Sequence, residues 1–482
     1  MNSTPNQSMP PIPKRLLLLL ILLPLFLSAC TGGGGEDPSL VVLVSVDQLR
    51  GDLLMKYDSL FTGGFRRLLD DGYRFTSASH VHGVTATGPG HATLSTGSFP
   101  YRSGIVGNSW LERTPDGWRS VYCVEDTMVH ILAHPAMEGR SPRNLMRPGL
   151  ADWIAEADSG AIVVSVSRKD RAAVTMAGQG RGHVYWITED EGQFVTSSFY
   201  ADAYPSWVER FNRDRMPQIF ADSIWEATAS PAWQERARPD TSSFEGDGTH
   251  TTFPHRFHEE VADAEGRRAL NRWAYDQIYP DDAVGAFAQE AVRVLGLGQD
   301  EVTDYLGLSF SQADAIGHAY GPRSQEQLEN LLHLDRVLGS LMSSMDDAVG
   351  EGRWVMALSA DHGAMDIPEL FVGENPDARR GSGEDFQVLR GLFERYRGME
   401  GDPLEVADAL VQELEALPFI ADAMTAAEIT GGPPADSFVT LIRNSYHPER
   451  WVGGSGSQGS GVLFRFVEGY YPSADPRGRG QG

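Results

Sequence analysis

The chain has 482 residues, of which 41% are hydrophobic, and it carries a formal net charge of −26 from 40 basic and 66 acidic residues. This length and apolar content are sufficient for one large core or two smaller ones, and they predict a globular protein. The negative charge, with no basic stripe along the sequence, argues against a chain-wide affinity for nucleic acid or anionic lipid, because both need clustered Lys and Arg.

The N-terminus has the pattern of an export signal. Two basic residues precede an apolar run, 16–27, that is too short to cross a bilayer as a helix. The run ends in Leu27-Ser28-Ala29-Cys30, and small residues before a cysteine resemble the bacterial lipoprotein cleavage box, in which the cysteine becomes the lipidated N-terminus. We therefore predict a signal peptide over 1–30, lipidation of Cys30 and a flexible tether over 31–38. The alternatives are an ordinary signal peptide with an incidental cysteine, or an uncleaved anchor.

This signal predicts a location in the bacterial cell envelope, on the periplasmic side or at the cell surface. Thr31, which follows the cysteine, is not acidic, and this favours an outer-membrane anchor over retention in the inner membrane. No apolar run after Leu40 is long enough to span a membrane, so we expect membrane contact through the lipid alone. Only Cys123 remains besides Cys30, so no intramolecular disulfide is expected.

The body of the chain alternates strand-like and helical segments. Its first apolar run, 40–46, is β-branched and typical of a strand buried on both faces of a parallel sheet. Similar runs follow at 161–166, 305–310 and 354–358, with helical segments such as 64–71 and 325–345 between them. We predict an α/β fold, a three-layer α/β/α sandwich with a mostly parallel central sheet. The stretch from about 180 to 300, rich in Trp, Pro, His and charge, is predicted to be an inserted cap.

Polar side chains follow the predicted strands, where ligands gather in open sheets of this kind. Several of them are carboxylates and imidazoles, which are ligand types that zinc prefers. Together they have the composition of a two-metal site. The residues are Asp47, Lys169 with Arg171, Asp314 with His318, and Asp361 with His362.

A candidate nucleophile lies in the segment Thr85-Ala-Thr-Gly-Pro-Gly-His-Ala92. Gly88-Pro89 breaks regular structure, and the residues after it predict a helix running towards Thr96. Thr87 would then lie near the helix N-terminus, where free amide groups favour a bound phosphate. Considered alone, a Thr before a Gly-Pro turn is more often a helix cap than a nucleophile.

Taken in order, these motifs resemble those of the alkaline phosphatase superfamily. The likeness runs from about Leu40 to the last residue and is strongest to the phosphate-irrepressible alkaline phosphatases, which use a threonine nucleophile. The motifs are Ser45-Val-Asp-Gln48, Thr87-Gly-Pro-Gly-His91, Gly107-Asn-Ser-Trp110, Ser167-Arg-Lys-Asp-Arg171, Asp314 to His318, and Ser359-Ala-Asp-His-Gly363.

The resemblance implies two Zn²⁺ ions and hydrolysis of small-molecule phosphate monoesters through a phosphothreonine intermediate. Thr87 would be the nucleophile, and Asn108, Lys169 and Arg171 would hold the non-bridging phosphoryl oxygens. These three residue types suit that role independently, since Arg offers a planar fork, Lys a point charge and Asn an amide donor. The implied ligands are Asp47, Thr87, Asp361 and His362 for the first zinc, and Asp314 and His318 for the second.

Three other functions compete with this one. A phosphodiesterase or nucleotide pyrophosphatase of the same superfamily would share the zinc ligands and the threonine. Lys169 and Arg171 favour the monoesterase, because a monoester dianion exposes more non-bridging charge than a diester. A sulfatase would need a modified Cys or Ser near Thr87, where no Cys is present. A non-catalytic envelope lipoprotein that binds phosphorylated ligands is the remaining alternative.

The sequence departs from the family pattern at its C-terminal end. It stops at Gly482 without the Gly-x-x-His-Gly segment that would supply the third ligand of the second zinc. His447 is a candidate substitute, but its Ser-Tyr-His-Pro setting matches an upstream motif, so we expect a structural or surface role for it. We therefore expect an incomplete chain whose second zinc site, left with Asp314 and His318, binds metal weakly.

Overall fold

The computed structural model describes residues 37–261, 266–371, 373, 375–397, 399–434, 436–450 and 461–473. The predicted signal peptide, Cys30, all but the last two residues of the tether and the final stretch 474–482 lie outside the described residues. Within the described ranges, no helix combines the length and apolarity needed to span a bilayer.

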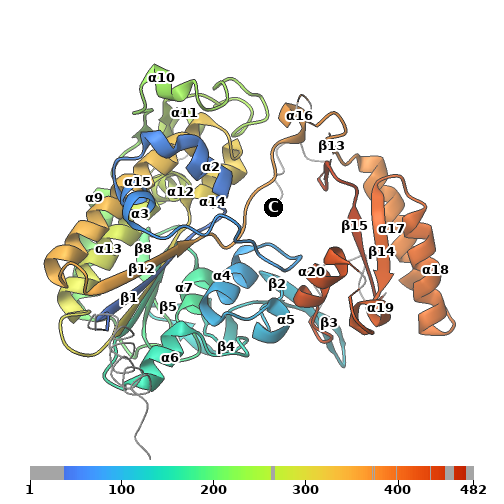
Figure 1. Cartoon of the computed structure of the whole chain (residues 1–482), viewed down its shortest axis with the longest axis horizontal. Coiled ribbons are helices and arrows are strands. Elements are labelled where there is room, and N and C mark those ends of the chain that lie inside the picture. The colour runs from blue at the N-terminus through green and yellow to red at the C-terminus, as the bar shows by residue number, and fades with distance from the viewer. Residues whose placement is uncertain are drawn as a thin grey trace, which may run out of the picture.

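A six-stranded sheet forms the centre of the main body, with the strand order β12-β1-β11-β6-β7-β8 (Figure 1). Neighbouring strands run parallel except β7 and β8, which are antiparallel. The strands are β1 (Leu40–Val46), β6 (Val163–Ser167), β7 (His183–Thr188), β8 (Gln193–Val195), β11 (Asp304–Phe310) and β12 (Trp354–Ser359). The predicted mostly parallel α/β sheet is therefore confirmed.

Alternating side chains of β1 explain why the sheet has a helix layer on each face. Val42 and Val44, both fully buried, belong to a large core on one face. Leu43 instead packs with Met176 and Tyr305 in a smaller core on the other face. Because successive side chains of a strand point to opposite faces, a continuous apolar run needs cover on both sides.

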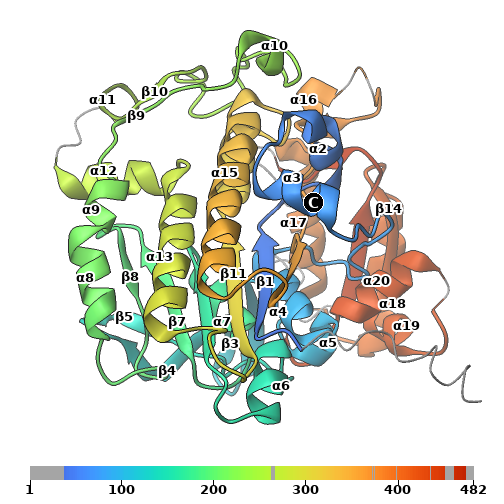
Figure 2. The ribbon, with the colours of Figure 1, turned by 60° about the vertical axis from the view of Figure 1, so that its left-hand side comes forward.

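Helices provide this cover and complete the three layers. Figure 2 shows α13 and α15 in front of the sheet, and Figure 1 shows α6 on the opposite side of the sheet. The first layer contains α13 (Tyr279–Leu295) and α15 (Gln325–Ala348), with α2 (Gly51–Tyr57), η2 (Asp58–Leu60), α3 (Gly64–Asp71) and α14 (Gln312–Tyr320) beside them. The second contains α6 (Leu150–Ala157) and α7 (Asp170–Met176), against which α4 (Thr87–Thr96) packs.

Two β-hairpins and a short helix extend the second layer. Apolar residues of the hairpins form one buried core with α4 and α7, which includes Trp110, Val121 and Cys123. The elements are α5 (Pro100–Ser103), β2 (Ser109–Thr114), β3 (Gly117–Tyr122), β4 (Glu125–Ile131) and β5 (His134–Arg140).

The stretch predicted to be an inserted cap has two parts. Its ends supply β7, β8 and α13 to the main body, whereas residues 196–278 form short elements outside the central sheet. These are α8 (Ser206–Asp214), α9 (Met216–Ile219), β9 (Ile224–Trp225), α10 (Pro231–Gln234), β10 (His255–Arg256), α11 (Phe257–Glu260) and α12 (Arg267–Tyr275). Figure 1 shows α10 and α11 at the top, above α14.

The C-terminal part forms a lobe with its own apolar core, drawn in orange and red in Figure 1. The lobe contains α17 (Gly383–Arg397), α18 (Pro403–Glu415), β14 (Ile420–Thr425), α19 (Ala426–Thr430), α20 (Ser437–Ser445) and β15 (Val462–Phe466). Between β12 and this lobe lie α16 (Pro368–Phe371) and β13 (Arg379–Arg380), and β13 pairs with β16 (Tyr470–Tyr471).

Helix α20 joins this lobe to the main body just upstream of α4. The amide of Gly83 donates to the Ser445 hydroxyl at 2.7 Å and to the Leu441 carbonyl at 3.1 Å. The amide of Val84 donates to the same hydroxyl at 3.2 Å. The loop that leads into α4 is therefore held by residues from the far end of the chain.

Candidate active site

The predicted site residues meet because their four strands are neighbours in the sheet. Asp47, Lys169 and Asp361 each lie two residues after a serine, and Asp314 lies in the first turn of α14, after β11. The serines form one row across β12, β1, β11 and β6, paired in register as Ser359, Ser45, Ser309 and Ser167. This register places the four chain segments at the same edge of the sheet.

Three of the residues form a buried cluster that could hold a metal ion. Asp47, Asp361 and His362 each offer a ligand atom, and these atoms lie within 4.8 Å of one another. Asp47 Oδ1 and His362 Nε2 are 3.4 Å apart, and neither has a hydrogen-bond partner among the described residues. Orphaned polar atoms are rare in a protein interior, and two carboxylates with one imidazole match the preference of zinc. This donor set therefore fits the predicted ion.

The charges of the cluster support the same conclusion. Burial raises the pKa of Asp47, but Lys169 and His362 outweigh it and hold the pKa well below its usual range. Burial lowers the pKa of His362, but Asp361 and Asp47 outweigh this effect and raise it to about 9. The cluster thus keeps Asp47 ionised and favours positive charge beside it.

Thr87 begins α4, as the sequence predicts. Its helix can approach the metal-site loop only because residue 90 is glycine, since a Cβ there would lie 2.4 Å from the Asp361 carbonyl oxygen. At Gly88 a Cβ would lie 3.2 Å from Asn108 Oδ1, which accepts the Gly88 amide at 2.7 Å. Both glycines therefore serve close approach between segments.

Two cations converge on the Thr87 hydroxyl. Lys169 Nζ and Arg171 Nη2 both donate to Thr87 Oγ1 at 3.4 Å. Lys169 Nζ also contacts Asp47 Oδ2 at 2.6 Å and Asp314 Oδ2 at 2.5 Å. The lysine thus lies between the two predicted ligand sets and beside the predicted nucleophile.

Asp314 and His318, the predicted second ligand set, are adjacent on α14. Their side chains approach to 3.1 Å, and Gln48 Nε2 lies 2.8 Å from Asp314 Oδ1 and 3.2 Å from His318 Nε2. The backbone amide of Gln48 also donates to Asp361 Oδ1 at 3.0 Å. Gln48 has a φ of 65°, which is uncommon for a residue other than glycine. Gln48 thus contacts Asp361 through its backbone amide and contacts Asp314 and His318 through its side chain.

Two residues near the site have roles that sequence reasoning did not identify. Gln48 belongs to a quoted motif, yet nothing in its spacing indicated that it would contact both ligand sets. His91 also belongs to a quoted motif and had no assigned role, and its Nδ1 lies 3.0 Å from Asp361 Oδ2 while Nε2 lies 2.8 Å from the Ser309 hydroxyl. The Nδ1 atom also lies 2.9 Å from the Thr87 carbonyl oxygen, so His91 packs between the start of α4, β11 and the predicted ligand Asp361.

Further residues that sequence reasoning did not identify hold Arg171 in place. Its Nη1 donates to the Tyr122 hydroxyl at 3.3 Å, and that hydroxyl donates to Asp170 Oδ1 at 2.5 Å. The other carboxylate oxygen of Asp170 accepts from Arg140 Nε at 2.6 Å. Tyr122 and Arg140 come from the hairpins, which carry no recognisable motif.

The other histidine considered from the sequence, His447, lies in the turn after α20. Its Nδ1 accepts the amide of Glu449 at 3.2 Å, and it pairs with Arg450 in an isolated bridge. The guanidinium of Arg450 stacks on the Trp110 ring at 4.6 Å from the ring centroid. His447 thus lies in a turn that packs the C-terminal lobe onto the main body.

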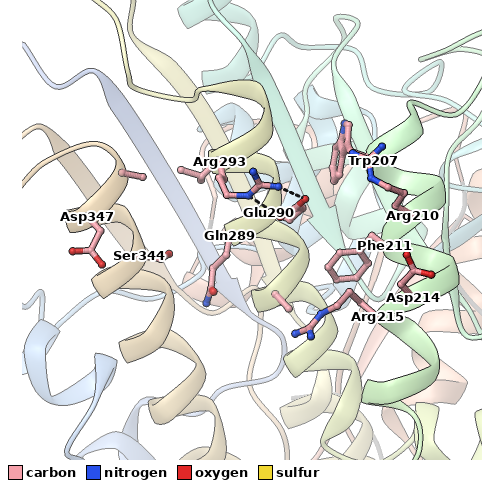
Figure 3. A pocket seen from close by; sticks show the side chains of 13 residues that line it. Trp207, Arg210, Phe211, Asp214, Arg215, Gln289, Glu290, Arg293, Ser344 and Asp347 are labelled. Atoms are coloured by element: carbon pink, nitrogen blue, oxygen red, sulfur yellow. Dashed lines mark hydrogen bonds and ion pairs between the residues drawn. The ribbon is translucent and has the colours of Figure 1, made fainter.

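A separate pocket of about 590 Å³ lies between α8, α13 and α15 (Figure 3). Trp207 and Phe211 contribute buried aromatic rings, and Arg293 Nη2 pairs with Glu290 Oε1 at 2.6 Å. None of its lining residues belongs to the motifs described above. The strand-end cluster therefore remains the candidate active site.

Comparison with known proteins shows which family the chain resembles. The family described as "Type I phosphodiesterase / nucleotide pyrophosphatase" matches residues 41–389. Alkaline phosphatase PhoV of Synechococcus elongatus is 32% identical over 357 residues, which cover 71% of this chain and 62% of the relative. Alkaline phosphatase PafA of Elizabethkingia meningoseptica is 32% identical over 334 residues, which cover 68% of this chain and 60% of the relative.

The fold agrees with these similarities. The crystal structure of wild-type alkaline phosphatase PafA has a TM-score of 0.81 and 27% sequence identity to this chain, and the match covers 93% of this chain and 89% of that one. The sequence alignments with this chain span 62% of the length of PhoV and 60% of the length of PafA.

Proposed function

Because this chain belongs to the type I phosphodiesterase / nucleotide pyrophosphatase family, we propose that it is an alkaline phosphatase, which hydrolyses phosphate monoesters with water to an alcohol and inorganic phosphate. The observation that carries the proposal is the convergence of Lys169 and Arg171 on Thr87 Oγ1. Two cations beside one hydroxyl favour a substrate with several non-bridging charges, which a monoester dianion has and a diester lacks.

In this proposal Thr87 is the nucleophile. Its oxygen attacks phosphorus in line with the leaving oxygen and forms a phosphothreonine, and water then releases phosphate. Lys169 and Arg171 bind the equatorial oxygens and stabilise their charge, while Asn108 donates from its amide group. The Asn108 oxygen meanwhile fixes the Gly88 amide at the start of the helix.

We also propose two zinc ions as cofactors. Asp47, Thr87, Asp361 and His362 would hold the first, and Asp314 and His318 would contribute to the second. When bound, zinc supplies positive charge that favours an ionised Thr87 hydroxyl and a charged leaving oxygen. The buried donor atoms of Asp47, Asp361 and His362 support the first site. Metal analysis of the purified protein gives the number and type of ions.

Steady-state kinetics with an aryl phosphate and its matched methyl diester test the reaction class. We expect a clear preference for the monoester, loss of turnover in Thr87→Ala with an unchanged fold, and phosphate trapped on Thr87 by rapid quench. A preference for the diester would favour the phosphodiesterase instead. Binding of phosphorylated ligands without turnover, with zinc added, would favour the non-catalytic lipoprotein.

We further propose that the protein is exported to the cell envelope and anchored by lipid at Cys30, with an outer-membrane location preferred. The proposal is supported by the Leu27-Ser28-Ala29-Cys30 motif after a short apolar run. Labelling of the expressed protein with a fatty acid, compared with Cys30→Ala, tests it. Equal labelling of the two proteins would exclude lipidation at this residue.

A further inference from the structure

A pocket of about 580 Å³ opens on the side of the site that holds Asp314 and His318. Lys169 and Arg171 also line the pocket, and these two residues belong with Asp314 and His318 to the proposed catalytic site. The rest of the lining has no role in the proposed function so far. It consists of Arg168, Tyr275 and Asp276 together with the small residues Gly246, Ala315 and Ala319. A phosphate ester held by Lys169 and Arg171 would extend its leaving group into this pocket, because both cations line it.

Arg168 is a fixed, nearly buried cation in this pocket. Its side chain is 8% exposed, and its guanidinium carbon lies 3.9 Å from the centroid of the Tyr275 ring. The Arg168 carbonyl accepts the Ile187 amide at 3.2 Å, which extends the pairing of β6 with β7. A guanidinium stacked on an aromatic ring keeps its edge available for bidentate binding of a carboxylate or phosphate.

The hydrogen-bonding capacity of Arg168 is largely unused within the described residues. Its Nη2 donates to Asp276 Oδ1 at 2.7 Å, whereas its buried Nε has no partner. The Asp276 side chain is 65% exposed, so water can solvate its carboxylate when the pair opens. An anion that enters the pocket could therefore replace or join Asp276 at the guanidinium edge.

We infer that Arg168, stacked on Tyr275, forms a second anion subsite for the leaving group of the substrate. The preferred substrates are then phosphate monoesters whose leaving group carries a further anionic group, a carboxylate or a second phosphate, close to the ester oxygen. This inference rests on the proposed monoesterase function and adds a substrate class to it. Asp276 weakens anion binding at this subsite, because its carboxylate competes with the substrate anion for Arg168.

Two esters that differ in one group test this subsite. 3-Phosphoglycerate and glycerol 3-phosphate share the same primary phosphate ester and differ in a carboxylate against a hydroxymethyl group. With the full, zinc-loaded chain we expect kcat/KM to be about tenfold higher for 3-phosphoglycerate, the gain of one charge-assisted hydrogen-bonded pair. Arg168→Met should lower kcat/KM for 3-phosphoglycerate much more than for glycerol 3-phosphate, so that the ratio approaches one.

Asp276→Asn should act in the opposite direction and raise the ratio, since it removes the competing charge. Asp276 is exposed, so this variant should fold even where Arg168→Met does not. Arg213→Met, the same chemical change at a side chain 64% exposed on α8, is the matched control and should leave the ratio unchanged.

A ratio near one in the unaltered protein, or equal losses on both esters in Arg168→Met, would overturn the subsite. Absence of turnover on glycerol 3-phosphate and on aryl phosphate would instead contradict the proposed function. The two failures are therefore distinguishable.

Discussion

Removal of the Tyr122 hydroxyl tests how Arg171 is held for catalysis. In Tyr122→Phe, Arg171 Nη1 loses its acceptor at 3.3 Å and Asp170 Oδ1 loses a donor at 2.5 Å. The ring and its packing remain. Burial raises the pKa of Tyr122, so the hydroxyl stays protonated and able to donate in alkaline solution, where the enzyme is expected to work.

The expected magnitude follows from these two bonds. Hydrogen bonds to charged groups contribute roughly 1.5–3 kcal/mol, and the longer bond to Arg171 belongs at the lower end. If about 1.5 kcal/mol is expressed in the transition state, kcat/KM for an aryl phosphate falls about tenfold. The shorter bond to Asp170 should appear in stability, as a loss of about 1.5–3 kcal/mol in the free energy of unfolding.

The assay compares aryl phosphate with its matched methyl diester, alongside denaturant unfolding of the same samples. The monoester should lose much more activity than the diester, because Arg171 interacts with the additional charge. Tyr73→Phe is the matched control, since the Tyr73 side chain is 93% exposed and the chemical change is identical. Equal losses on both esters, or no loss on either, would refute the assignment of Tyr122 as a positioning residue for Arg171.

Three further outcomes are expected. Replacing Lys169 and Arg171 together with alanine should reduce monoester turnover far more than diester turnover, and an equal reduction would show that the pair acts only structurally. Chelation should abolish activity and lower the melting temperature, with recovery on adding zinc, since a ligand at a hundredfold excess over its Kd stabilises by about 2.7 kcal/mol. Burial opposes protonation of His255, but hydrogen bonds to Glu260 and Glu326 raise its pKa to about 9. Its stabilising contribution is therefore complete below pH 6.5 and is lost as the pH rises through 9, by up to about 3 kcal/mol. Melting curves of the protein and of His255→Gln across that range should converge; parallel curves would exclude the effect.

The sequence was most informative where local pattern determines structure. The run Leu40–Val46 has the predicted bounds, and the helix predicted after Gly88-Pro89 ends at Thr96 as expected but begins already at Thr87, because a two-sided apolar strand and a Gly-Pro helix start are local signals. The strand-end residues also lie together as expected, since parallel strands present their carboxyl ends at one edge.

The remaining features depend on pairings that the sequence does not reveal. The serine row across four strands requires their order and register, and the contacts of Gln48 require its left-handed backbone. Tyr122 reaches Asp170 from a hairpin 48 residues earlier. The separate core of the C-terminal lobe likewise depends on packing between α17, α18, β14 and β15, which no single run of the sequence shows.

The bonds between α20 and the loop before α4 bear on how far the chain can be shortened. A protein ending at residue 389, where the family match ends, would keep every residue assigned to catalysis or to zinc under the proposed function but lose Leu441 and Ser445. The segment containing Gly83 and Val84 would then enter α4 without the three hydrogen bonds that fix its path. The placement of Thr87 therefore depends on the C-terminal lobe as well as on the main body, so replacing this lobe by that of a relative should change the activity.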